Sequence, residues 1–68
     1  MKISVNDNQV EVDGATTVSA LLTSLGYPER GIAVSVNYTV LPRSDWETKV
    51  SEFAQPVKLD VLAAVQGG

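Results

Sequence analysis

The sequence predicts an α+β fold, in which a mixed sheet of four or five strands wraps around one side of a single main helix. Three observations support this. Short runs of alternating apolar and polar residues occupy both ends of the chain, as in half-buried strands. One segment between them has the spacing of an amphipathic helix. A single helix cannot cover both faces of a sheet, so we expect the order strand, strand, helix, strand, strand, strand, packed on one face.

The first two strands are expected to form an antiparallel hairpin. Residues 1–5 alternate between polar and apolar side chains. Residues 6–8, Asn-Asp-Asn, follow, and these residue types tolerate the left-handed backbone of a tight turn. Alternation resumes with Val10 and Val12 on one side, which predicts a hairpin with a mostly apolar inner face.

The helix is expected to start after Thr17, whose hydroxyl can cap the first turn. Gly26 stands where a left-handed C-terminal residue is favoured, and Pro28 prevents continuation. A helix this short depends on burial of its apolar face rather than on intrinsic propensity. The residues expected to be buried on that face are Val18, Leu21, Leu22 and Leu25.

Three further strands are expected in the second half. Residues 32–36 alternate with small side chains on both faces, which suggests a central strand covered on both sides. A turn at residues 37–38 leads to a short strand over residues 39–41, which Pro42 ends because proline lacks a backbone donor. Residues 57–65 alternate again and predict a long last strand.

The link between the last two strands is less regular. Residues 44–47 could form a single helical turn with Ser44 as its cap. Trp46 is expected to fill a gap in the core beside a sheet edge. Phe53 is expected to cap the core, with membership of an exposed patch as the alternative.

The composition excludes many kinds of chemistry. The chain has no cysteine and no histidine, so disulfides, iron–sulfur ligands and the commonest general base are absent. Its five basic residues are scattered and the net charge is −3, which argues against nucleic-acid binding and suits a partner with a basic docking surface. We expect no metal, no bound cofactor and no enzyme activity in the chain itself.

Nothing in the sequence predicts membrane insertion. The longest apolar run, residues 61–65, is far shorter than the roughly 20 residues that span a bilayer. The N-terminus becomes polar too early for a signal peptide. We therefore expect no membrane partner and a cytoplasmic location.

The last four residues, Val65, Gln66, Gly67 and Gly68, are the candidate functional segment. Glycines without a Cβ let an extended arm thread a narrow channel. We expect a single domain over residues 1–65 and a flexible tail over residues 66–68, which carries the Gly68 carboxylate into a partner's active site. The alternative is that the two glycines are incidental.

A partner-docking patch is expected beside this tail. Leu62 and Ala64 make the end of the outer strand face apolar, and Phe53 is a further candidate. The alternative is that a neighbouring loop covers this face.

Several short motifs, each present once, are distributed over essentially the whole chain. They are Val5-Asn6-Asp7, Thr17-Val18 with Leu21-Leu22, Ala33-Val34-Ser35-Val36-Asn37, Val40-Leu41-Pro42-Arg43 followed by Trp46, and the terminal Val65-Gln66-Gly67-Gly68. In combination they resemble the ThiS family, the thiamine-biosynthesis sulfur carriers of the ubiquitin-like β-grasp superfamily. One piece departs from the family pattern. Where members often carry an Asp-Gly-Asp-like turn before the last strand, this chain has residues 53–56, Phe-Ala-Gln-Pro.

The resemblance implies a carrier rather than an enzyme. A ubiquitin-activating-type adenylating enzyme (ThiF-like) would consume ATP to adenylate the Gly68 carboxylate. Sulfur from a donor such as a cysteine desulfurase would then replace the adenylate and give a thiocarboxylate. A thiazole synthase (ThiG-like) would use that sulfur to build the thiazole of thiamine. Because the mixed anhydride with AMP makes the carbonyl open to attack, the carrier itself needs neither cysteine nor histidine.

Other interpretations share the same fold. The small subunit of molybdopterin synthase and other thiocarboxylate carriers are usually longer and often have a proline before the final glycines, which this chain lacks. A protein-conjugating ubiquitin-like modifier would share the tail chemistry. A non-catalytic β-grasp interaction module would bind through a sheet face and would not depend on Gly68.

Overall fold

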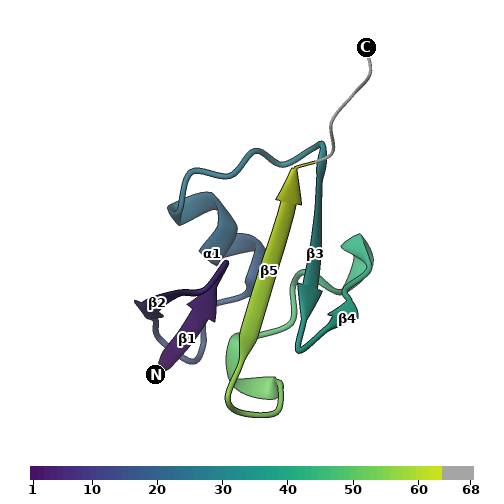
Figure 1. Ribbon diagram of the computed structural model, residues 1–68. Coiled ribbons are helices and arrows are strands. Elements are labelled where there is room, and N and C mark those ends of the chain that lie inside the picture. Colours follow the sequence, from purple (N-terminus) through teal and green to yellow (C-terminus); the bar gives the residue numbers. More distant parts are fainter. Residues whose placement is uncertain (64–68) are drawn as a thin grey trace.

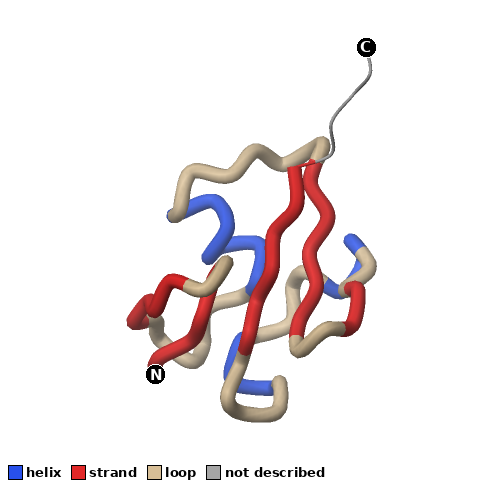
Figure 2. The backbone as a smooth tube through the Cα atoms, in the orientation of Figure 1, coloured by secondary structure: helices blue, strands red, loops and turns tan. Residues whose placement is uncertain are grey.

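The computed structural model describes residues 1–63 of the 68-residue chain. The elements follow the predicted order of five strands and one helix (Figure 1). Two 3₁₀ turns, η1 and η2, lie between the last two strands (Figure 2). The bounds are β1 (Lys2–Val5), β2 (Asn8–Glu11), α1 (Val18–Ser24), β3 (Ile32–Val36), β4 (Thr39–Val40), η1 (Arg43–Asp45), η2 (Val50–Glu52) and β5 (Lys58–Ala63).

The five strands form one mixed sheet in the order β2-β1-β5-β3-β4. β1 and β5 are parallel, and the other neighbouring strands are antiparallel. β5, the last strand in sequence, therefore lies in the middle of the sheet with a neighbour on each side (Figure 1). This confirms the predicted β-grasp fold.

Both hairpins close through two-residue turns with a left-handed backbone. Asn6 and Asp7 have φ of 50° and 68°, and Asn37 and Tyr38 have φ of 51° and 70°. Positive φ at both central residues matches the right-handed twist of the flanking strands. Asparagine adopts this conformation at low cost, so both turns lie where the sequence predicts them.

The first backbone N–H groups of helix α1 have no acceptor within the helix, and each of them donates to an acceptor outside it. Thr17 caps the helix as predicted, because its Oγ1 accepts from the Ala20 N–H at 3.0 Å. The N–H groups of Val18 and Ser19 donate to the carbonyls of Thr48 and Trp46 at 3.1 and 2.9 Å. The link after β4 is thereby fixed to the start of the helix. At the other end, Gly26 has φ +90°, as its predicted role requires.

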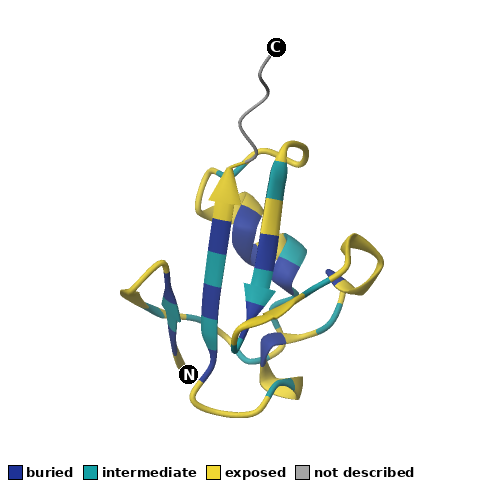
Figure 3. Cartoon of the chain, turned by 45° about the vertical axis from the view of Figure 1, so that its right-hand side comes forward, coloured by how far each residue is buried: buried dark blue, intermediate teal, exposed yellow. Residues whose placement is uncertain are grey.

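The core lies between α1 and one face of the sheet. Burial alternates along β3 and β5, where buried bands alternate with more accessible ones (Figure 3). Trp46 is 5% exposed, and its indole N–H donates to the Leu41 carbonyl at 3.2 Å, which confirms that it fills a gap in the core. The buried residues are Ile3, Val5, Val18, Leu21, Leu22, Val34, Val36, Trp46, Val50, Val57, Leu59 and Val61.

Two burial predictions are wrong. Leu25 is 40% exposed, because it is the residue that ends the helix and lies at the rim of the core. β3 is covered on one face only, since Ala33 is exposed while Val34 is buried. A single seven-residue helix covers only one side of the sheet.

The link between β4 and β5 also differs from the prediction. The 3₁₀ turn begins at Arg43 rather than Ser44, and the residue before it is Pro42, with no side-chain cap. Proline has no backbone N–H, so Pro42 leaves no donor without a partner at the start of this turn. β4 ends at Val40 and β5 begins at Lys58, so both strands are shorter than expected. Phe53 packs against the core.

Candidate functional site

The predicted tail lies outside the described residues. This applies to Ala64 and to the whole candidate segment Val65, Gln66, Gly67 and Gly68. The structure therefore describes the platform that carries the tail. The last described residue, Ala63, pairs with Ile32 at the end of β5. The described part of the chain thus ends in the strand at the middle of the sheet, next to the start of β3.

Within residues 1–63, no helix or loop covers the face of the sheet opposite α1 at this end. Leu62 is 71% exposed and lies opposite Ala33, which is also exposed. No described loop covers Leu62, so the alternative of a covering loop does not apply within residues 1–63. Phe53 does not join it, because Phe53 packs against the core on the other side of the sheet. The structure thus separates two of the residues predicted for one patch.

Two further exposed apolar side chains were not predicted. Val40 is 72% exposed, and Tyr38 is 81% exposed. Val40 pairs with Ser35, whose other neighbour is Asp60, so Val40 shares the open face with Leu62. The alternation of a two-residue strand is too short to assign its faces, and that is why the sequence gives no signal for Val40.

Charges cluster at the opposite end of β5. The Lys58 ammonium lies 2.7 Å from Asp7 and 3.6 Å from Asp60, and it stands 5.9 Å from the centre of the Tyr38 ring. The hydrogen bond from Lys58, together with its charge, lowers the pKa of Asp7. The same hydrogen bond raises the pKa of Lys58, and the charge of Asp60 adds to that rise. These groups are solvent-accessible, so the pair is screened by salt.

Two asparagine side chains complete the backbone pairing of β5. Oδ1 of Asn6 accepts from the Val61 N–H at 2.8 Å, and Oδ1 of Asn37 accepts from the Lys58 N–H at 2.8 Å. Both asparagines are the first residue of a left-handed hairpin turn. The sequence predicts the turns but not these bonds, because nothing local places residue 6 beside residue 61.

Comparison with known families shows to which family the chain belongs. The model of the ThiS family matches residues 3–68, which is nearly the whole chain and includes the terminal glycines. The chain belongs to the ThiS family. This confirms the resemblance seen in the sequence, and membership supports a role in thiamine biosynthesis.

Solved structures agree with the ThiS assignment. A crystal structure of the thiamine biosynthesis protein ThiS from Geobacter metallireducens is 27% identical, with a TM-score of 0.72, and the match covers all of both chains. A solution structure of a thiamine biosynthesis protein from the same organism is also 27% identical, with a TM-score of 0.70, and the match covers all of this chain and 88% of that one. A comparison with curated proteins found no significant match.

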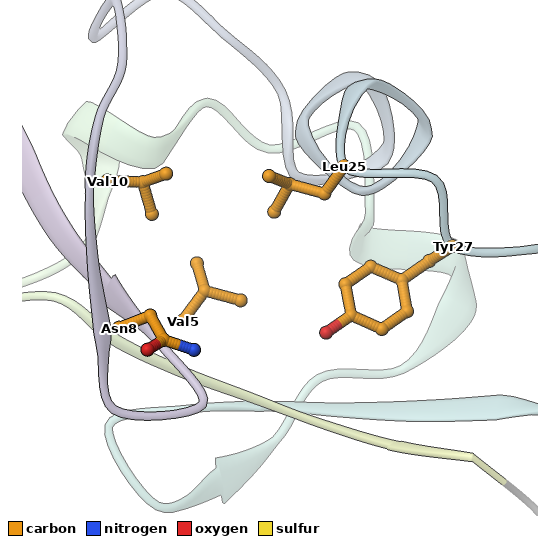
Figure 4. Close-up of a pocket in the computed structure, with 5 residues that line it drawn as sticks. All are labelled: Val5, Asn8, Val10, Leu25 and Tyr27. Atoms are coloured by element: carbon orange, nitrogen blue, oxygen red, sulfur yellow. The ribbon is translucent and has the colours of Figure 1, made fainter.

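A hollow of about 150 Å³ lies between the first hairpin and the end of α1 in this ThiS-family chain. Three aliphatic side chains and the Tyr27 ring surround it (Figure 4), and the lining residues are Val5, Asn8, Val10, Leu25 and Tyr27. It contains no ionisable carboxylate or ammonium. Its lining therefore offers no acid–base pair for catalysis.

Residues 1–63 contain neither a cluster of metal ligands nor a helix that could span a membrane. No group of three or more acidic side chains within that range could hold a metal ion. No helix in the described part is long and apolar enough to cross a membrane.

Proposed function

We propose that this chain is a sulfur carrier in thiamine biosynthesis, and that the carboxylate of Gly68 is the group that carries the sulfur. The observation that carries the proposal is the ThiS-family match, which extends over residues 3–68 and so reaches the terminal Gly67-Gly68. The fold agrees with it, because the central strand β5 leads directly towards that end.

The proposed chemistry is activation of a poor electrophile. A ThiF-like adenylating enzyme joins the Gly68 carboxylate to the AMP part of ATP, and pyrophosphate leaves. The terminal sulfur of a persulfide, supplied by a donor such as a cysteine desulfurase, then attacks the carbonyl and AMP departs. A thiol reduces the resulting acyl disulfide and releases the thiocarboxylate. A ThiG-like thiazole synthase takes the sulfur. In this scheme the chain binds no cofactor and performs no catalysis; ATP is consumed by the partner.

The role of the described residues is to hold the tail at a fixed place. Residues 64–68 add at most about 18 Å when fully extended, at roughly 3.3–3.6 Å per residue. An enzyme acting on Gly68 must therefore approach within that distance of Ala63. The exposed surface closest to Ala63 along the strand is Leu62.

We therefore place the docking surface for the adenylating enzyme on the open sheet face around Leu62 and Ala33, with Ala64 as a further member by sequence. Apolar side chains at such a site supply binding energy when an enzyme covers them. Phe53 has a structural role in the core instead. Val65, Gln66 and Gly67 then form the arm that threads the enzyme's channel.

Intact-protein mass spectrometry tests the proposal. The purified chain is incubated with ATP, a ThiF-like enzyme shown to be active on its own carrier, and a sulfur donor. We expect a mass gain that matches one oxygen replaced by one sulfur, absent when ATP is omitted or Gly68 is deleted. If the full-length chain gains no adenylate and no sulfur, the carrier proposal is wrong and a binding module is the better description.

A further inference from the structure

We infer that Asn6 is a positioning residue for the carrier reaction: its side chain fixes the end of β5, and thereby the point and direction from which the C-terminal arm departs. This inference rests on the proposed carrier function. It assigns a role to an exposed turn residue that lies 55 residues from the amide it binds.

Asn6 continues the β1–β5 ladder after β1 itself has ended. The Ser4 N–H donates to the Val57 carbonyl at 3.0 Å, and the Asn6 N–H donates to the Leu59 carbonyl at 2.9 Å. The next donor on that edge is the Val61 N–H, and it bonds to the side-chain Oδ1 of Asn6 at 2.8 Å. The side-chain carbonyl thus replaces the backbone carbonyl that a longer β1 would supply.

The side-chain amide of Asn6 is itself held in place. Its Nδ2 donates to the Tyr27 hydroxyl at 3.1 Å, and Tyr27 is half-buried against the core. The backbone of Asn6 has φ 50° in the tight turn. With both amide atoms bonded and the backbone fixed by the turn, the side chain has a single arrangement.

The consequence for the tail follows from the register. The pairing of β1 with β5 ends at Val5 and Leu59, whereas β3 pairs with β5 as far as Ala63. Beyond Leu59, the side-chain amide of Asn6 is therefore the hydrogen-bonded support of Val61 on the β1 side, two residues before Ala63, the last described residue. Without it, the end of β5 is held through β3 alone, and the arm starts from a wider range of directions. Such freedom must be removed when the arm threads an enzyme channel.

Asn37 provides a matched control. It has the same residue type, the same turn position and φ 51°, and its Oδ1 accepts from a β5 amide at the same 2.8 Å. Its partner, however, is Lys58 at the start of β5, away from the tail. Loss of the Asn37 side chain should therefore cost stability without disturbing the end of the strand.

The test compares Asn6→Gly with Asn37→Gly in the full-length chain. Glycine accepts the positive φ, so each substitution removes the amide without straining the turn. Amide hydrogen exchange is measured by NMR. Adenylation is measured by pyrophosphate exchange with a ThiF-like enzyme, at a temperature where circular dichroism shows both variants folded. Asn6→Asp, which keeps an acceptor oxygen but loses the donor to Tyr27, is the second variant if Asn6→Gly does not fold.

We expect the Val61 amide of Asn6→Gly to lose its protection from hydrogen exchange. We also expect kcat/KM for adenylation of this variant to fall roughly fivefold, which corresponds to the net free energy of one hydrogen bond. Asn37→Gly is expected to lose protection at Lys58 but to keep kcat/KM within about twofold. Asn6→Asp should retain protection at Val61 and most of the activity.

Equal losses of kcat/KM in Asn6→Gly and Asn37→Gly would overturn the inference, and so would a Val61 amide that stays protected in Asn6→Gly or one that loses protection in Asn6→Asp. A wild-type chain that is not adenylated at all would instead overturn the proposed function. The two failures are distinguishable, because the first compares variants of a chain that reacts.

Discussion

The ammonium nitrogen of Lys58 lies 2.7 Å from Oδ1 of Asp7, so a side chain at the start of β5 is tied to the first hairpin turn across 51 residues. The Lys58 side chain is 27% exposed, and that of Asp7 is 86% exposed. The pair lies on the open face of the sheet, at the end away from Leu62.

This pair predicts a pH dependence of stability. The hydrogen bond and charge of Lys58 lower the pKa of Asp7 from its ordinary 3.8, so the stabilisation is present above 3.8 and is lost as pH falls through the lowered pKa. The pKa of Lys58 is raised from 10.5, so its contribution is complete below 10.5 and is lost as pH rises through the raised value.

We therefore expect Asp7→Asn to lower stability slightly at neutral pH and to have no such effect at a pH below the Asp7 pKa. Urea denaturation of both proteins at the two pH values measures the difference, and an NMR titration of the Asp7 carboxyl locates its pKa. High salt should reduce the difference at neutral pH. A difference that persists in acid would show that Asp7 stabilises the turn without its charge.

Burial in the core predicts a large difference in the stability cost of truncating two leucines of the same helical segment. Leu22 is 2% exposed, and Leu25 is 40% exposed. Leu22→Ala should cost about 2–5 kcal/mol, which approaches the 3–5 kcal/mol that a core of this size supplies, so we expect a largely unfolded chain. Leu25→Ala is the matched control and should cost about 1 kcal/mol. A cooperative thermal transition of Leu22→Ala near the wild-type temperature would contradict this.

The helix cap predicts a second contrast, between adjacent threonines. Thr17 Oγ1 accepts from the Ala20 N–H at 3.0 Å, so Thr17→Ala should lower stability by about 1 kcal/mol. Thr16→Ala is the control, because Thr16 pairs with Val50 through its backbone carbonyl, at 2.9 Å. Chemical denaturation compares the two. Equal costs would mean that the hydroxyl of Thr17 contributes little to the start of the helix.

The proposed docking surface predicts that position along the open face matters. Leu62 and Val40 have nearly equal exposure, 71% and 72%, but of the two only Leu62 is next to Ala63, the last described residue. We expect Leu62→Glu to weaken binding to the adenylating enzyme about tenfold, as for a residue worth more than 1 kcal/mol at an interface. Val40→Glu should weaken it less. Isothermal titration calorimetry measures both, and a larger effect at Val40 would move the docking surface towards β4.

Local chemistry determined most of the elements of this chain. The alternation of residues 1–5 and 32–36 places two strands, and the Asn-containing turns close two hairpins. Thr17 and Gly26 mark the two ends of the helix. Each of these depends on residues close in sequence, whose backbone preferences act before any tertiary contact forms. The terminal Gly67-Gly68 and the absence of cysteine and histidine likewise come from the sequence alone, and they direct attention to a carrier.

Tertiary structure decided what local patterns do not encode. Ala33 and Leu62 lie on the open face because α1, the one α-helix in residues 1–63, covers the other face. Leu25 is exposed because the helix ends there at the rim of the core. β5 enters the middle of the sheet between β1 and β3, which brings the Val61 amide within 2.8 Å of the Asn6 side chain. That contact joins residues 55 positions apart. No local preference specifies such a pair, since it arises only when the last strand is inserted between two strands already formed by distant parts of the chain.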